Sequence, residues 1–206
     1  MSKGRFITFE GIDGSGKSTQ ARLLHEHLSN TGHNAVLTRE PGGSAGAEEI
    51  RRLLVEGDPE RWSPETEILL FTAARRDHLE KTIQPALDRG AIVVSDRFAD
   101  STRVYQGAAR GELRNLVDTL HDAVIDFEPF LTFVIDMDPE IALARGLARR
   151  SGEDRFEEMG PAFQQKLQSG FRTLAKDWPE RCHLIDGAQS EEAVATDVAT
   201  IADALI

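Results

Sequence analysis

Five short apolar runs recur along the chain, and each is followed by a longer stretch in which apolar and polar residues alternate at helical spacing. Such runs suit strands that are buried on both faces of a sheet. Strands that alternate with helices pair in parallel through right-handed crossovers and leave a ligand crevice beyond their carboxyl ends. The pattern therefore predicts an α/β fold whose functional groups gather along one edge of the sheet. The predicted strands are residues 6–9, 35–38, 91–95, 131–135 and 183–185.

Several helix boundaries are also visible in the sequence. Ser63 and Asp138 each stand directly before a proline, the order expected of a capping side chain and a first-turn proline. The helix that begins at Ser63 should run to about residue 90. Two further amphipathic helices are predicted over residues 156–176 and 191–205.

Length and charge limit the classes to which the chain can belong. No repeat or long linker divides residues 1–206, so we expect a single domain. A net charge of −11 argues against nucleic acid or an acidic membrane as a partner, because both need a broad positive surface. No run approaches the roughly 18 apolar residues of a membrane span. The single cysteine, Cys182, excludes an internal disulfide framework and fits a reducing compartment.

The strongest chemical motif follows the first predicted strand. The segment from Gly11 to Ser18 fills the pattern G-x-x-x-x-G-K-[ST], whose glycines let backbone N–H groups point at phosphate oxygens. The Lys17 ammonium is expected on the β- and γ-phosphates as a catalytic group, and the Ser18 hydroxyl on Mg²⁺. We therefore expect ATP or a similar triphosphate to bind at Gly11, Ile12, Asp13, Gly14, Ser15, Gly16, Lys17, Ser18 and Thr19.

Charged residues follow two other predicted strands at the same edge. Asp96 comes directly after the apolar run 91–95 and can reach the Mg²⁺ shell, and its neighbour Arg97 can reach phosphates. Arg39 ends the second strand just before a Pro-Gly-Gly turn, which leaves it at the crevice. Arg51, on the next helix, is a further phosphate candidate.

Phe71 and Arg75 stand four residues apart on the long predicted helix, so their side chains share a face. Together they could hold a flat ring by stacking and an exocyclic oxygen by hydrogen bonding. A helical phenylalanine is more often a core residue, and that interpretation stays open here.

The stretch of about residues 145–157 contains several arginines and two glycines. In isolation it could be a solvated charged loop, but beside a triphosphate site it favours a lid that closes on the transferring phosphoryl group. A crevice rich in arginine suits a phosphorylated acceptor. A phosphate monoester is largely a dianion at neutral pH and needs no general base.

Taken together, these motifs resemble the bacterial thymidylate kinase family of P-loop nucleoside monophosphate kinases. The resemblance implies a P-loop three-layer sandwich with a five-stranded parallel sheet, a short arginine-bearing lid, and a cytoplasmic homodimer. It also implies Mg²⁺-dependent transfer of the γ-phosphoryl group of ATP to dTMP, which yields dTDP for DNA synthesis. It spans essentially the whole chain, and its most specific stretches are residues 9–19, 39–43, 71–75, 96–98 and 101–107.

The resemblance also implies roles for individual residues. Asp13 would bind the 3′-hydroxyl of dTMP, Phe71 would stack on thymine and Arg75 would read a base carbonyl. Arg39 and Arg97 would bind the acceptor phosphate. The other acceptor contacts implied are Ser101, Thr102 near the base, Tyr105 against the 2′ position, and Gln106.

The catalytic arginine of the family lies either in the phosphate loop or in the lid. The loop position here is Gly14, so the resemblance implies a lid arginine, and the choice among Arg149, Arg150 and Arg155 stays open. Two other functions were weighed. Another nucleotide or deoxynucleoside kinase would differ in the acceptor pocket, whereas a GTP-binding switch is disfavoured because the chain has no N-K-x-D motif.

Overall fold

Five strands form one parallel sheet in the order β2-β3-β1-β4-β5. A computed structural model describes residues 4–58, 61–109, 113–149 and 160–206. All five predicted strands are present within a residue or two of their predicted bounds. They are β1 (Arg5–Glu10), β2 (Ala35–Arg39), β3 (Ile92–Asp96), β4 (Leu131–Asp136) and β5 (Cys182–Asp186).

Helical segments connect the strands, and the predicted helix after Ser63 consists of three consecutive elements. The Ser63 hydroxyl accepts a hydrogen bond from the Thr66 N–H, as expected of a cap. A short π-helical stretch, η1, then interrupts the α-helix. The elements are α1 (Lys17–Asn30), α2 (Ala45–Val55), α3 (Pro64–His78), η1 (Leu79–Ile83), α4 (Gln84–Asp88), α5 (Ala99–Thr102), η2 (Arg103–Ala109), α6 (Arg114–Val124), α7 (Pro139–Arg149), α8 (Pro161–Asp177) and α9 (Glu191–Leu205).

The last two helices also match their predictions where they can be compared. Helix α9 spans the predicted residues 191–205. Helix α8 is described from Pro161, and residues 156–159, where the sequence predicted its start, lie outside the described residues. No helix in the described part of the chain is both long enough and apolar enough to cross a bilayer.

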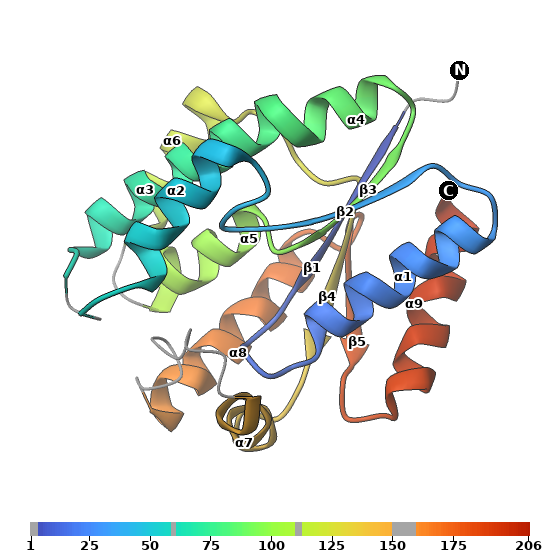
Figure 1. The fold of residues 1–206 in the computed structure, drawn as a ribbon. Helices are drawn as coiled ribbons and strands as arrows, with labels where there is room; N and C mark the ends of the chain where they lie inside the picture. The colour runs from blue at the N-terminus through green and yellow to red at the C-terminus, as the bar shows by residue number, and fades with distance from the viewer. Residues whose placement is uncertain (1–3, 59–60, 110–112, 150–159) are drawn as a thin grey trace.

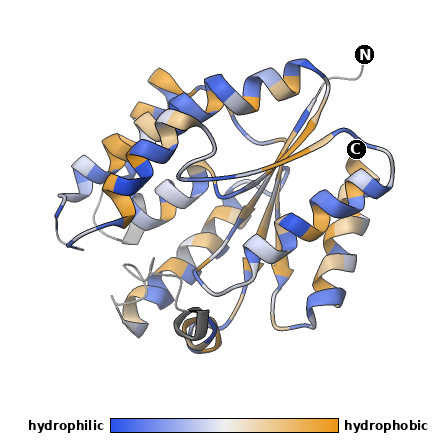
Figure 2. Cartoon of the chain, viewed as in Figure 1, coloured by the Kyte–Doolittle hydropathy of each residue, from blue (hydrophilic) through white to orange (hydrophobic). Residues whose placement is uncertain are grey.

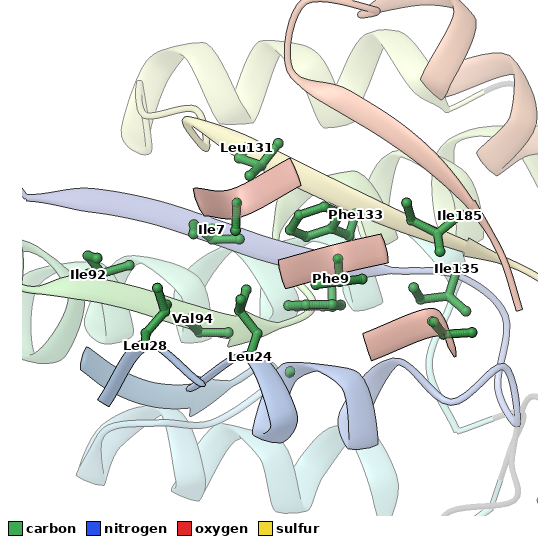
Figure 3. Packing of buried hydrophobic residues seen from close by; sticks show 14 residues of the cluster. Ile7, Phe9, Leu24, Leu28, Ile92, Val94, Leu131, Phe133, Ile135 and Ile185 are labelled. Carbon is green, nitrogen blue, oxygen red and sulfur yellow. The ribbon is translucent and has the colours of Figure 1, made fainter. Parts of the chain in front are cut away.

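The sheet is the middle of three layers (Figure 1). Helices α1 and α9 cover one face, where Leu24 and Leu28 of α1 pack against strand residues such as Phe9, Phe133 and Ile135 (Figure 3). Residues of η1, α4 and α8 cover the opposite face. Each fully buried Leu, Ile or Phe contributes about 1.5–3 kcal/mol to the stability of the fold, so the apolar packing on both faces stabilises the sheet. Figure 2 shows the helices striped with apolar and hydrophilic residues, as helices on the faces of a sheet should be.

The parallel pairing brings the carboxyl ends of three neighbouring strands together. Phe9 of β1 lies opposite Asp96 of β3, and Arg39 of β2 lies on the other side of Asp96. The phosphate loop follows β1 directly. The predicted functional residues at the ends of β1, β2 and β3 therefore lie together at the carboxyl edge of the sheet, as the sequence predicted.

Candidate active site

A cavity of about 440 Å³ opens at the carboxyl ends of these strands. Its walls come from the phosphate loop, the ends of β2 and β3, and the helical segments α2, α3, α5 and η2. All of the residues predicted to bind the acceptor or the metal line this cavity, together with Lys17. They are Asp13, Lys17, Ser18, Arg39, Phe71, Arg75, Asp96, Arg97, Ser101, Thr102, Tyr105 and Gln106.

The phosphate loop ends in a helix start, as its motif predicts. Gly16, with a φ of 97°, precedes the first residue of α1, Lys17, so the first N–H groups of the helix lie at the loop. The Lys17 ammonium donates to the Ile12 carbonyl and to Asp13 Oδ1, both at 3.2 Å. Burial, and then the charge of Arg97, lowers the pKa of Lys17.

Gly14 of the phosphate loop touches the backbone of α7. Its φ is +81°, and a Cβ placed on it would lie 1.9 Å from the carbonyl oxygen of Ala142. Any side chain at this position would have to displace α7, so the loop cannot supply a catalytic arginine in this arrangement. Of the predicted lid arginines, Arg149 is the last residue of α7, and Arg150 and Arg155 lie outside the described residues.

Arg97 is held in a cage of polar groups at the end of β3. Its backbone is left-handed, with a φ of 72°, a conformation that a non-glycine residue adopts at a cost of about 1–3 kcal/mol. The guanidinium donates to Asp13 Oδ1, to Ser101 Oγ at 2.7 Å and to the Gly11 carbonyl at 3.3 Å. The structure thus brings the phosphate loop and Arg97 into direct contact across 84 residues of sequence.

Tyr105 completes the cage. Its hydroxyl donates to Asp13 Oδ2 at 3.0 Å and accepts from Arg97 Nη2 at 3.1 Å. Burial raises the pKa of Tyr105, which keeps the phenol neutral and able to donate. Burial opposes ionisation of Asp13, but Arg97 and Lys17 hold the pKa of Asp13 well below its usual range. Lys17 and Arg97 therefore share the Asp13 carboxylate, and Asp96 and Glu10 also act on Arg97 as negative charges. The charged N–H donors at this end of the cavity suit an anionic ligand.

A second set of contacts orients Arg75, which is 4% exposed. Its Nε donates to Glu40 Oε2 at 2.8 Å, and its Nη2 donates to the Phe98 carbonyl at 3.1 Å and to Thr102 Oγ1 at 3.0 Å. Phe71 comes from the same helix and lines the same cavity, as the spacing of four residues predicts. Phe71 therefore lies on the cavity wall and is not simply a core residue.

Sequence reasoning missed the support behind Arg75. Glu40 Oε1 lies 3.0 Å from His78 Nδ1, and His78 Nε2 lies 2.7 Å from Thr38 Oγ1. Glu40 and His78 are both buried. Glu40 lies within the stretch from residue 39 to 43 that the sequence singled out, but nothing in that stretch indicates a partner 35 residues away.

Three other candidate residues on the cavity wall already have protein partners. Arg39 is paired with Glu48 at 3.1 Å, and just over half of its side chain is exposed. Arg51 donates to the Pro41 carbonyl at 2.5 Å, and Gln106 Nε2 donates to Glu67 Oε2 at 3.3 Å. Arg39 and Arg51 can therefore turn to a ligand only by exchanging existing contacts.

Two residues with oxygen side chains that could hold a metal, Asp96 and Ser18, line the cavity. Asp96 Oδ1 is buried and has no hydrogen-bond partner among the described residues, a costly state for a carboxylate oxygen unless a ligand or ordered water satisfies it. Ser18 lines the same cavity. The described residues contain no group of three or more His, Cys, Asp or Glu side chains that could hold a metal. A hydroxyl and one carboxylate fit Mg²⁺, which takes its remaining ligands from water and phosphate oxygens.

Comparison with known proteins points to one family. A sequence model described as thymidylate kinase matches residues 9–198. The thymidylate kinase of Dinoroseobacter shibae is 71% identical over 195 residues, which cover 95% of this chain and 94% of that protein. The thymidylate kinase of Jannaschia sp. is 65% identical over 95% of this chain and 94% of its own length. The crystal structure of thymidylate kinase from Ehrlichia chaffeensis superposes with a TM-score of 0.78 at 40% identity, covering 97% of this chain and 98% of that one.

Proposed function

The chain belongs to the thymidylate kinase family, and from that premise we propose how its cavity transfers the γ-phosphoryl group of ATP to dTMP. The products are dTDP, a precursor for DNA synthesis, and ADP. The observation that carries the proposal is the contact of Lys17 and Arg97 with the same carboxylate, Asp13, in the cavity that Phe71 and Arg75 also line. A donor site and an acceptor site thereby share one space.

The acceptor lies with its base toward α3 and its phosphate toward Arg97. Phe71 stacks on thymine and Arg75 donates to a base carbonyl, because a guanidinium has donors and no acceptor. Arg97 and Arg39 bind the acceptor phosphate. Asp13 accepts a hydrogen bond from the 3′-hydroxyl of dTMP, and the Tyr105 ring occupies the space that a 2′-hydroxyl would need. The remaining acceptor contacts are Ser101, Thr102 and Gln106.

The donor lies on the phosphate loop, residues Gly11 to Thr19. Backbone N–H groups at the start of α1 bind the phosphates, and the Lys17 ammonium stabilises the charge that develops on the transferring group. Mg²⁺, held by Ser18 and Asp96, would neutralise part of the phosphate charge when bound. Because Gly14 leaves no room for a side chain, the further cation comes from Arg149, Arg150 or Arg155.

Three broader features complete the proposal. The chain acts as one kinase domain over residues 1–206, with its lid at about residues 145–157. It works as a homodimer in the cytoplasm. None of these features is needed for the acceptor contacts described above, which lie within one copy of the chain.

Release of ADP with a panel of acceptors tests the proposal. With ATP and Mg²⁺, dTMP should be the preferred acceptor among dTMP, dUMP, CMP, AMP and thymidine. Faster turnover of thymidine than of dTMP would show that the arginines do not bind an acceptor phosphate, and a preference for AMP would contradict the base site. Removal of Mg²⁺ with a chelator should abolish turnover, and readdition should restore it.

A further inference from the structure

A buried carboxylate lies behind the cavity and has no part in the contacts proposed above. Glu10 is the last residue of β1, is 0% exposed, and is not among the lining residues of the cavity. A buried carboxylate is costly unless hydrogen bonds satisfy it. Its partners therefore show what the carboxylate holds in place.

Both oxygens of Glu10 are engaged by the segment that follows β3. Oε1 accepts from the Phe98 N–H at 2.8 Å, and Oε2 lies 2.6 Å from the Ser101 hydroxyl. Phe98 is the residue after Arg97, whose backbone is left-handed. Strained backbone persists where its surroundings over-determine it, and the bond to the Phe98 N–H supplies such a constraint.

The direction of the hydrogen bonds links Glu10 to Arg97. Arg97 Nη1 lies 2.7 Å from Ser101 Oγ, and a guanidinium can only donate. The serine oxygen therefore accepts from Arg97, which leaves the single serine hydrogen for the Glu10 carboxylate. The three side chains form a chain in which each group donates to the next and which ends on a buried negative charge.

We propose that Glu10 is a positioning residue for Arg97. Through Ser101 and the Phe98 N–H it holds the guanidinium in the orientation that meets the acceptor phosphate, without touching the substrate. This inference rests on the proposed role of Arg97 in binding that phosphate.

The charges around Glu10 give the link a pH dependence. Burial first, and then the carboxylate of Asp100 on α5, raise the pKa of Glu10 to about 7, although Arg97 opposes this rise. Cys182 of β5 also interacts with Glu10. Below pH 7 a proton on the carboxyl removes the negative charge on which the chain of hydrogen bonds ends, and the orientation of Arg97 is then less strongly held.

Steady-state kinetics of Glu10→Gln test the link. We expect the KM for dTMP to rise about tenfold, the size of effect that loss of one charge-assisted hydrogen bond produces, with the KM for ATP unchanged. Thr8→Val is the matched control, because Thr8 lies on the same strand as Glu10. The substitution removes a buried hydrogen bond to Thr132 and affects no contact of Arg97 or Ser101. It should lower the melting temperature and leave the KM for dTMP unchanged. A Glu10→Gln variant that behaves like this control has lost only stability, and the inference is then wrong.

A double-mutant cycle with Arg97→Met separates failure of the inference from failure of the proposed function. If Glu10 acts through Arg97, Glu10→Gln should add nothing to the KM for dTMP in the Arg97→Met background. Additive effects would overturn the positioning role. If Arg97→Met itself leaves that KM unchanged, the proposed phosphate contact is wrong instead. Should Glu10→Gln not fold, Glu10→Asp, which keeps the charge but shortens the side chain by one methylene and so withdraws it from Ser101, enters the same cycle.

The pH profile supplies a readout that a purely structural role would not move. The phosphate of free dTMP titrates identically whichever variant is assayed. The difference between two pH profiles of KM therefore reports titration of groups on the enzyme. Relative to Glu10→Gln, the wild-type KM for dTMP should rise as the pH falls through about 7. Parallel profiles would contradict the inference.

Discussion

Two sets of buried arginines in this molecule have the same kinds of partner but different surroundings. Arg75 and Arg97 bind buried or half-buried carboxylates and line the cavity. Arg103 and Arg181 bind Asp100, which is 1% exposed, and neither is among the lining residues. The two sets cannot be told apart by burial or by charge.

The difference lies in which of these arginines line the cavity. Arg181 makes two bonds to Asp100, at 2.6 and 3.0 Å, and a third to Thr132 at 3.0 Å. Arg103 and Arg181 also lie 5.1 and 4.9 Å from the centre of the Trp178 ring. Arg75 and Arg97 are enclosed in a similar way, at 5.2 Å from the Phe98 ring and 5.0 Å from the Tyr105 ring, but both also line the cavity. A buried ion pair marks a ligand site only where a cavity reaches it.

The largest expected effect is a loss of stability outside the cavity. Arg181→Met leaves part of the Asp100 charge unpaired in the interior and should lower the free energy of unfolding by about 3–5 kcal/mol. Urea denaturation measures this loss. The KM for dTMP, measured where the variant is folded, should not change. A raised KM together with normal stability would group Arg181 with Arg75 and Arg97, and would contradict the distinction between arginines that line the cavity and arginines that do not.

The reverse pattern is expected at the phosphate loop. Lys17→Ala removes the ammonium that we propose stabilises the transferring group, so kcat should fall about 10²–10³-fold. Its free energy of unfolding should change far less than that of Arg181→Met, because Asp13 keeps Arg97 as a partner. Near-normal turnover would show that Lys17, although it lines the cavity, is not part of the chemistry.

A smaller effect is expected at the base end of the cavity. Phe71→Ala removes the stacking surface and should raise the KM for dTMP about tenfold, with a smaller change in kcat. Leu69→Ala is the matched control on the same helix, because its side chain is largely exposed and does not line the cavity. An unchanged KM in the Phe71 variant would return this residue to a packing role.

The sequence predicts the main elements of the fold well because their signals are local. Each apolar run became a strand, and Ser63 became a cap, since burial on both faces and capping act within a few residues. The π-helical turn at Leu79–Ile83 was missed because its residues continue an ordinary helical pattern. The strand order was not predicted either, because right-handed crossovers constrain which neighbours are possible without choosing among them.

The site follows the same division. The phosphate loop and Asp96-Arg97 could be predicted because strand ends place them. The supports of the arginines could not, since Glu40 meets Arg75 across 35 residues and Glu10 meets Ser101 across 91. Nor does the sequence indicate that Arg181 pairs with Asp100, which lies 81 residues away. Such pairs are set by tertiary packing.

The smallest expected effect is on the free energy of unfolding. It concerns Glu128, a partner of Arg103, and it depends on pH. Glu128 pairs with Arg103 and with His121 Nε2, the latter at 3.0 Å. Burial opposes its ionisation, but hydrogen bonds from His121 and Arg103 prevail and lower the pKa of Glu128 from 4.5 to about 2. Because the folded pKa lies below the unfolded one, the stabilisation is present above pH 4.5 and is lost as the pH falls toward 2.

Solvent screening limits the size of this contribution, since the Glu128 side chain is 43% exposed. We therefore expect the loss of stability to be no more than about 1 kcal/mol. Urea denaturation between pH 5 and 3 measures it, and Glu128→Gln should flatten the pH dependence relative to the wild type. Glu140→Gln, an exposed change on α7, should leave the wild-type slope unchanged. If the slope of Glu128→Gln equals that of the wild type, the bonds from His121 and Arg103 do not hold this carboxylate in its charged form.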